Sequence, residues 1–239
     1  MSDETAQRIR NAASVIVIRR LGPGAAGARV LMGCRQAGAI FMANKMVFPG
    51  GALDDADHRA AQAFPPPAPL ADLLGRRPMR TVGPDVDPNP DPHLGAALAM
   101  AALRELSEEA GVAPRGTGQA PGDLPEAWQR YCTRHGPPNA DGLEMVFRAV
   151  TPPGRPRRFD ARFVTMDAAQ LADPDDFTGA DGELSNLSWL SLAEAEQQDL
   201  PFVTRLVLAE IAARLEAPET SREVPFLNHD GVQARLTPL

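Results

Sequence analysis

The stretch RELSEEAGV, from Arg104 to Val112, places three glutamates within five residues. It completes a run of strong helix formers, and Gly111 stands where a helix would end. On a helix, Glu105, Glu108 and Glu109 fall within an arc of roughly 100°. A separate arc is apolar and would pack against the rest of the fold; it contains Ala99, Leu103, Leu106 and Ala110. The stretch therefore predicts a helix with one core face and one concentrated anionic face.

Nothing in this stretch neutralises the three carboxylates. Like charges three or four residues apart on a helix repel each other, and Arg104 alone cannot balance three of them. Glutamates on exposed helices usually alternate with lysines, whereas these do not. A solvated helix face is the alternative interpretation. A hard divalent cation resolves the conflict, because Mg²⁺ and Mn²⁺ suit carboxylate oxygens, so we predict that Glu105, Glu108 and Glu109 bind Mg²⁺ or Mn²⁺.

The composition limits the class of protein. The chain has 239 residues, of which 44% are hydrophobic, and its net charge is −7. This charge argues against a nucleic-acid partner, which favours a basic face, but a small phosphorylated ligand needs only a few local cations. Cys34 and Cys132 show no metal-ligand spacing, which predicts a reducing cytoplasm rather than a disulfide framework. The sequence has no signal-peptide-like start and no apolar window long enough to span a membrane, so no membrane partner is expected.

Hydrophobic patterning predicts one α/β domain with a mixed β-sheet over residues 1–239. The expected strands are 13–20, its antiparallel partner 29–36, 45–51, 143–152, 157–166 and the start of 183–197. The expected helices are 92–110, capped by Asp91 with Pro92 in its first turn, 124–134, the end of 183–197, and the amphipathic 201–217. Residues 58–92 are proline-rich with little periodicity, which suggests an insertion, a lid or partial disorder. The C-terminal tail, 218–239, has no clear pattern.

RELSEEAGV resembles the helical half of the signature of Nudix hydrolases, Arg-Glu-apolar-x-Glu-Glu-x-Gly-apolar, with every fixed position matched. FPGG, residues 48–51, matches the segment that normally leads into this signature. The resemblance implies the Nudix fold, an α/β/α sandwich, and hydrolysis of a diphosphate linked to another group. It assigns Glu108 and Glu109 as core metal ligands and Glu105 as a further ligand or an orienting group. Arg104 would hold a glutamate in its rotamer.

The signature is split in this chain. It normally runs from its first glycine, here Gly51, over five residues to a glutamate, and over seven more to the arginine. The sixth position after Gly51 is Asp57, and 46 residues separate Asp57 from Arg104, so about 39 residues are inserted (46 − 7 = 39). Asp57 is a candidate replacement for the missing glutamate. The split signature and its flanking segments resemble the Nudix branch whose animal members hydrolyse coenzyme A and acyl-CoA in peroxisomes.

Three further residues precede or open the signature. Gly50 and Gly51 lack side chains, so a metal or a phosphate could approach their backbone closely. Arg35 matches the first position of a coenzyme A signature that another Nudix branch carries before FPGG. The other positions of that signature do not match; they hold Gln36, Ile40 and Asn44. Only Arg35 therefore supports this second resemblance.

Two other groups of residues are candidates for the site. Glu183 lies six residues before Trp189, where Nudix proteins often place a glutamate that serves as base or extra ligand; an exposed loop acid is the alternative. Arginines could receive substrate phosphates, because their geometry matches phosphate well; the group comprises Arg148, Arg157, Arg158 and Arg162. The alternative is a solvated strand edge guarded by charge, which we favour for Arg157 and Arg158.

Three functional hypotheses follow. The first is a metal-dependent diphosphatase that cleaves coenzyme A or acyl-CoA to 3′,5′-ADP and (acyl)phosphopantetheine. The second is a diphosphatase for ADP-ribose or nucleotide sugars. The third is a non-catalytic Nudix domain that senses a nucleotide. This hypothesis is suggested by the split signature and by Asp57 at the position of the signature glutamate. In each case the partner is a small nucleoside diphosphate derivative, and the helix 124–134 is a candidate homodimer face.

Overall fold

The computed structural model describes residues 9–38, 42–76, 91–229 and 233–239. In this part of the chain, the strands form one sheet in the order β3-β2-β1-β6-β5-β8-β9, with β4 also paired to β1 and β7 to β2. The strands are β1 (Ile9–Arg20), β2 (Ala28–Arg35), β3 (Met46–Val47), β4 (Gly50–Ala52), β5 (Glu144–Val150), β6 (Arg158–Asp167), β7 (Leu184–Ser191), β8 (Pro225–His229) and β9 (Ala234–Pro238).

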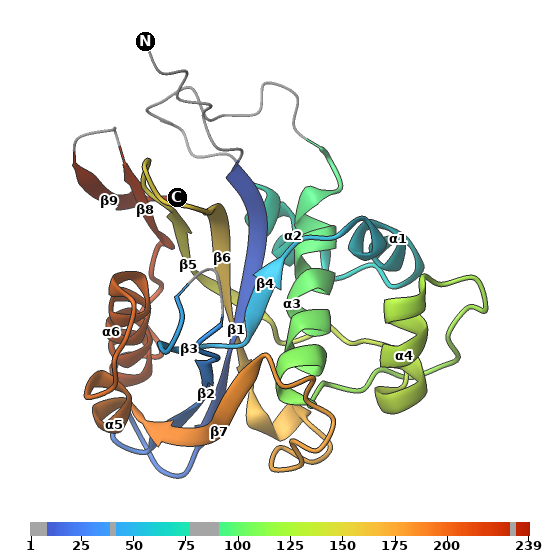
Figure 1. The fold of residues 1–239 in the computed structure, drawn as a ribbon, viewed down its shortest axis with the longest axis horizontal. Coiled ribbons are helices and arrows are strands. Elements are labelled where there is room, and N and C mark those ends of the chain that lie inside the picture. Colours follow the sequence, from blue (N-terminus) through green and yellow to red (C-terminus); the bar gives the residue numbers. More distant parts are fainter. Residues whose placement is uncertain (1–8, 39–41, 77–90, 230–232) are drawn as a thin grey trace.

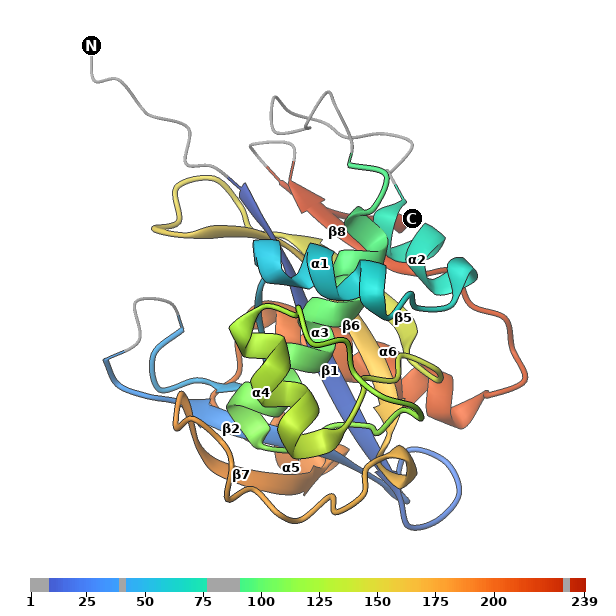
Figure 2. The same ribbon diagram turned by 90° about the vertical axis from the view of Figure 1, so that its right-hand side faces the viewer.

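Helices cover both faces of the sheet (Figure 1 and Figure 2). They are α1 (Asp55–Ala63), α2 (Ala68–Gly75), α3 (Leu94–Ala110), α4 (Glu126–His135), the 3₁₀ turn η1 (Ala168–Gln170), α5 (Leu192–Glu196) and α6 (Phe202–Glu216). One buried hydrophobic cluster joins the sheet to α1, α2, α3 and α4, and a second joins the opposite face to α5 and α6. The predicted α/β/α sandwich with a mixed sheet is confirmed.

Strand β1 lies at the centre of the sheet. It runs parallel to β6 from Ile9 to Ile18 and antiparallel to both β2 and β4. The predicted antiparallel pairing of 13–20 with 29–36 is therefore correct, although β1 starts earlier than predicted. Because side chains alternate along a strand, Val15 and Val17 pack into one hydrophobic cluster and Ile16 and Ile18 into the other.

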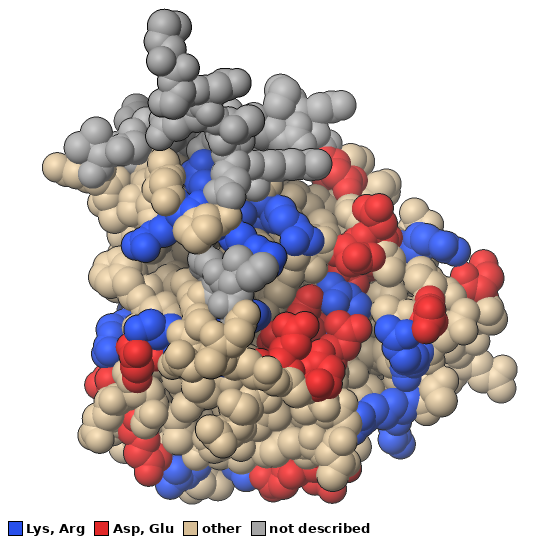
Figure 3. Space-filling view, in the orientation of Figure 1, with Lys and Arg blue, Asp and Glu red and all other residues tan. Residues whose placement is uncertain are grey.

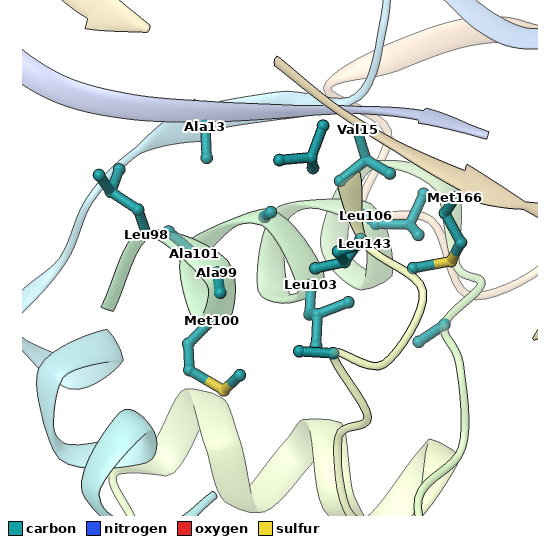
Figure 4. Packing of buried hydrophobic residues seen from close by; sticks show 14 of the residues in the cluster. Ala13, Val15, Leu98, Ala99, Met100, Ala101, Leu103, Leu106, Leu143 and Met166 are labelled. Atoms are coloured by element: carbon teal, nitrogen blue, oxygen red, sulfur yellow. The ribbon is translucent and has the colours of Figure 1, made fainter. Parts of the chain in front are cut away.

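Helix α3 packs its small and apolar side chains on β1. Figure 4 shows Ala13 and Val15 of β1 pointing toward this helix. Leu103 and Leu106 are fully buried, and burial of each contributes about 1.5–3 kcal/mol to folding. The helix ends as predicted, because Gly111 has a φ of 75° and its N–H donates to the Ser107 carbonyl. The core-facing stripe predicted from the sequence thus sets the orientation of the glutamates.

The start of α3 differs from the prediction. The helix begins at Leu94 rather than at Pro92, and its N-cap residue is His93, whose side chain makes no capping hydrogen bond. Asp91 instead accepts a hydrogen bond from the His93 backbone N–H at 2.8 Å, and its other carboxylate oxygen lies 3.2 Å from His58. Asp91 therefore fixes the turn before the helix and links it to α1.

The strand predicted over residues 45–51 is two strands. β3 pairs with β2, and β4 pairs with β1, with Phe48 and Pro49 between them. Pro49 has no N–H to offer a strand partner, but its carbonyl accepts from the Val15 N–H at 2.9 Å. This change of partner strand brings Gly50 and Gly51 next to the centre of the sheet.

Residues 58–75, the first part of the proline-rich region, contain most of α1 and all of α2. Helix α1 begins at a capping box, in which Asp54 accepts from the Ala56 N–H and Asp57 accepts from the Asp54 N–H. Helix α2 follows Pro67 and buries Leu70 and Leu74. Both helices are short and separated by three prolines, so neither shows a clear period in the sequence. Residues 77–90 of the predicted insertion lie outside the described residues.

The C-terminal tail extends the sheet. β8 runs parallel to β5, and β9 pairs antiparallel with β8. Phe226 and Leu227 of β8 are buried, but so short a strand, followed by polar residues in the sequence, gave no decisive sequence pattern. Cys34 and Cys132 are free thiols. None of the helices in the described part has both the length and the apolar character needed to cross a membrane.

Candidate active site

Arg104 is the centre of a polar cluster on α3. Its almost buried guanidinium donates to both carboxylate oxygens of Asp57, from Nε at 2.9 Å and from Nη2 at 3.0 Å. Nη1 donates to Glu105 Oε1 at 2.9 Å and to Glu108 Oε2 at 2.8 Å. Burial alone would lower the pKa of Arg104, but the hydrogen bond to Asp57 and the surrounding negative charges outweigh burial and raise it. One arginine thus positions two of the predicted metal ligands.

Asp57 supplies the buried carboxylate that Arg104 requires. It lies in the first turn of α1 and is completely buried. It lies six positions after Gly51, and the folded chain brings its carboxylate to Arg104 although 46 residues separate the two in the sequence. Helices α1 and α3 pack against each other, so Asp57 and the stretch RELSEEAGV meet in space.

Trp128 is a member of this cluster that sequence reasoning missed. It is completely buried on α4, and its Nε1–H donates to Asp57 Oδ1 at 3.3 Å. The sequence places Trp128 on the apolar side of a helix, which predicts packing and gives no sign of a polar partner. A buried indole N–H normally finds a hydrogen-bond acceptor, and that general expectation was the one sequence-level sign that Trp128 has a polar partner.

Glu109 is held by the segment that opens the signature. Its Oε2 accepts from the Gly50 N–H at 2.7 Å, and its Oε1 accepts from Arg35 Nη2 at 3.1 Å. The same Arg35 nitrogen donates to the Gly50 carbonyl at 3.2 Å. Burial raises the pKa of Glu109 to about 8, although Arg35 and the Gly50 N–H act to lower it. Arg35 therefore lies against a predicted metal ligand.

Glu105 lies against Gly51. A Cβ atom at Gly51 would be 2.5 Å from the Glu105 carboxylate, closer than any real contact. Only glycine allows this approach, so Gly51 is required for the position of Glu105. Burial raises the pKa of Glu105 to about 7, against the opposing effect of Arg104. Glu108 is the most exposed of the three, with 35% of its side chain accessible.

The three glutamates and Glu183 form one acidic region. Glu183 is exposed in the loop before β7, and its charge contributes to the raised pKa of Glu109. Figure 3 shows a compact patch of acidic side chains near the middle of this face of the molecule. Glu105 and Glu108 share Arg104, while Glu109 is held separately by Arg35 and the Gly50 N–H.

The donors of this region fit a divalent cation. All of them are carboxylate oxygens, which suit Mg²⁺ and Mn²⁺. The raised pKa values of Glu105 and Glu109 mean that nearby arginines do not fully compensate for burial of their charges. Within the described residues, no three His, Cys, Asp or Glu side chains form a ready-made metal-binding group, since Arg104 and Arg35 hold the carboxylates instead.

Arg148 and Arg162 have other partners. Both are buried and contact Asp160, which accepts from Arg148 at 2.8 and 2.6 Å and lies 3.2 Å from Arg162. Burial would raise the pKa of Asp160, but the two arginines hold it below its ordinary value. Arg148 also donates to the Arg76 carbonyl, and Arg162 to the Leu74 carbonyl, at the end of α2. These contacts anchor α2 to the sheet and give no support to the predicted role in binding substrate phosphates.

No family model and no curated protein matches the chain. Among solved structures, the chain is similar to a NUDIX hydrolase from Alicyclobacillus acidocaldarius, with 27% identity, a TM-score of 0.58, and coverage of 89% of this chain and 95% of the other. It is also similar to a MutT NUDIX hydrolase from Burkholderia pseudomallei (14% identity, TM-score 0.46, coverage 86% and 99%). A third similar structure is the NUDIX domain of Shewanella oneidensis NrtR complexed with ADP ribose (12% identity, TM-score 0.44, coverage 90% and 94%).

Proposed function

We infer that this chain is a Nudix hydrolase that cleaves a diphosphate bond, and we propose that its substrate is coenzyme A or acyl-CoA. The products would be 3′,5′-ADP and (acyl)phosphopantetheine. The hydrolase assignment is carried by one observation: in a Nudix fold, Arg104 is fixed by buried Asp57 and holds Glu105 and Glu108, of which Glu105 lies against Gly51. The coenzyme A assignment is supported by the split signature and its flanking sequence.

The residues of the site have separate roles in this proposal. Glu105, Glu108 and Glu109 hold Mg²⁺ or Mn²⁺, which when bound would neutralise the diphosphate and lower the pKa of the attacking water. Arg104 orients two of these glutamates, while Arg35 and the Gly50 N–H orient the third. The lack of a side chain at Gly51 allows the Glu105 carboxylate to lie against the backbone there.

Glu183 is the proposed base or extra ligand, because it is exposed and close enough to Glu109 to affect its pKa. Arg35 remains a proposed contact to substrate, since its side chain keeps 22% of its surface accessible while it orients Glu109. A cytoplasmic location and a homodimer through residues 124–134 also stay predictions.

The contact of Asp57 with Arg104 weakens the argument for the hypothesis of a non-catalytic nucleotide sensor. That hypothesis treated Asp57 as a defect of the signature, but its carboxylate makes two hydrogen bonds with the arginine. A shorter acid is therefore compatible with an ordered site.

A substrate panel with Mg²⁺ or Mn²⁺ tests the proposal. Coenzyme A, acyl-CoA, ADP-ribose and nucleotide sugars are compared, and products are identified by mass. We expect 3′,5′-ADP from coenzyme A; preferential release of AMP from ADP-ribose would instead support the second hypothesis.

Glu108→Gln tests the metal site. It should lower turnover by at least about a hundredfold, because it removes a ligand charge without changing the shape of the side chain. Glu126→Gln on α4 is the matched control, since that glutamate is 84% accessible and forms an ion pair with Arg130, four residues away on the same helix. Unchanged turnover in Glu108→Gln, with normal folding, would remove Glu108 from the metal site.

A further inference from the structure

A cavity lies at the N-terminal ends of β1 and β6. Its volume is about 540 Å³, within the range of small-molecule sites. Its lining includes Arg10 and Asn11 of β1, Leu53 after β4, and Arg157, Arg158 and Phe159 at the start of β6. The parallel register of β1 and β6 places Arg10 opposite Phe159 and Ile9 opposite Arg158. Three arginines separated in the sequence thus meet around one hollow.

The lining of this cavity is basic although the protein is acidic. The net charge of the chain is −7, yet none of the described residues that line the cavity is an aspartate or a glutamate. Arg10 and Arg157 are exposed, while Arg158 is buried and its Nε donates to the Thr151 carbonyl at 3.1 Å. Leu53 and Phe159 add a half-buried apolar wall. Guanidinium groups match phosphate oxygens in geometry and charge, so the cavity suits a phosphorylated group with an apolar part.

The cavity is close to the glutamates on α3. Leu53 is two residues beyond Gly51, which lies against Glu105, and two residues of extended chain span about 7 Å. The Leu53 N–H donates to the Asn11 carbonyl at 2.9 Å, so both belong to the continuation of the β1–β4 pair. Figure 3 shows basic side chains above the acidic patch, in the region where Figure 1 places the start of β1. One ligand can therefore reach both places.

We propose that this cavity binds a phosphate monoester of the substrate, separate from the diphosphate that is cleaved. This inference rests on the proposed function, because it assumes that a diphosphate lies at the glutamates. The substrate class is then a nucleoside diphosphate derivative with an additional phosphate on its nucleoside half, and the ribose spans the two sites. Substrates without the third phosphate would lose the contacts of Arg10 and Arg157.

Binding of adenosine 3′,5′-bisphosphate and of AMP, measured by isothermal titration calorimetry, tests the cavity directly. Neither ligand contains a diphosphate bond, so the measurement does not depend on turnover. We expect the bisphosphate to bind at least about tenfold more tightly, as charge-assisted hydrogen bonds predict. The double variant Arg10→Ala/Arg157→Ala should reduce this preference to less than about threefold. Arg155→Ala, an exposed arginine of the same loop that does not line the cavity, is the matched control.

Equal affinities of the wild-type protein for the two ligands would overturn the proposal, as would a preference that survives in the double variant. Inorganic phosphate that competes as well as the bisphosphate would also overturn it, because the cavity would then be a site for free phosphate. Thermal unfolding verifies that the variants fold.

Kinetics separate this proposal from the proposed function. With coenzyme A and 3′-dephospho-coenzyme A, the ratio of kcat/KM values should fall about tenfold or more in the double variant. If the bisphosphate preference depends on the two arginines but coenzyme A is not cleaved, the cavity assignment holds and the substrate assignment fails. If both compounds are cleaved equally well by the wild-type enzyme, the diphosphatase stands and the cavity assignment fails.

Discussion

Among single side chains, Asp57 is the one on which the glutamate cluster most depends. It is buried, it is bound by two nitrogens of Arg104, and the same arginine holds Glu105 and Glu108. Loss of the Asp57 charge would leave a buried guanidinium paired only with the glutamates. A single side chain outside α3 thus controls the rotamers of the residues proposed to bind metal.

Asp57→Asn should therefore lower both stability and turnover. Breaking a buried pair by removing one charge costs about 3–5 kcal/mol, and a released Arg104 should reduce turnover by about 10- to 100-fold. Denaturant unfolding and steady-state kinetics measure the two effects. Asp55→Asn, on an exposed position of the same helix, is the control. Reduced stability with unchanged turnover would show that Asp57 acts only in folding.

Gly51→Ala tests the close approach of backbone and carboxylate. A methyl group there would lie 2.5 Å from the Glu105 carboxylate, so the glutamate must move. We expect turnover to fall by about 10- to 100-fold, with the apparent affinity for Mg²⁺ reduced in parallel. Gly122→Ala is a suitable comparison, because a Cβ at that position meets nothing within 4 Å. Wild-type metal dependence in Gly51→Ala would argue against Glu105 as a ligand.

At the level of the elements, the backbones of α2 and α3 approach each other unusually closely. A Cβ atom at Gly95 would lie 1.8 Å from the carbonyl oxygen of Ala71, and Gly75 is also close to Gly95. The carbonyls that end α2 accept hydrogen bonds from Arg148 and Arg162. Helix α2 is therefore a packed part of the fold, fixed at one side by a glycine of α3 and at the other by buried arginines.

Gly95→Ala should destabilise the protein although alanine favours helices. The gain in helix propensity is about 1 kcal/mol, whereas a backbone overlap of this size requires α2 to shift and costs about 1–3 kcal/mol or more. We expect a lower melting temperature, by about 2–4 °C for each kcal/mol of net loss. Calorimetry measures this, with Gly122→Ala as reference. An increased melting temperature would show that α2 is not firmly packed on α3.

For the whole molecule, Asp160 and its two arginines link the sheet to α2. The two buried arginines that Asp160 neutralises lie on β5 and β6 and reach α2. Long-range strand pairing sets the positions of these two arginines. Their contacts with α2 therefore join segments that are far apart in the chain. It contributes to the stability of the scaffold that carries the glutamates.

Asp160→Asn should lower the free energy of unfolding by about 3–5 kcal/mol at neutral pH. The pKa of Asp160 is held below 3.8 in the folded state, so its contribution is fully present above that pH and is lost as the pH falls through the folded-state value. The difference between wild type and variant should therefore shrink in acid. Denaturant unfolding at several pH values measures it.

Asp175→Asn, which removes an exposed ion pair with Arg19, should change stability by no more than about 1 kcal/mol and serves as control. A pH-independent difference for Asp160→Asn would contradict the charged pairing.

The sequence by itself determined the helix of glutamates, its end at Gly111, most of the strands and the Nudix resemblance. Such features depend on local periodicity and on residues close together in the chain, which a sequence displays directly. The same reasoning identified the spacing from Gly51 to Asp57 but could not decide whether Asp57 had a partner.

Only the tertiary structure decided which charges meet. It brought Asp57 and Trp128 to Arg104, buried Arg148 and Arg162 against Asp160, and gathered Arg10 with Arg157 around a cavity. Local patterns carry no information about these pairings, because burial and long-range strand register fix them. The local sequence around an arginine in a strand does not show whether its side chain faces a ligand or a buried aspartate.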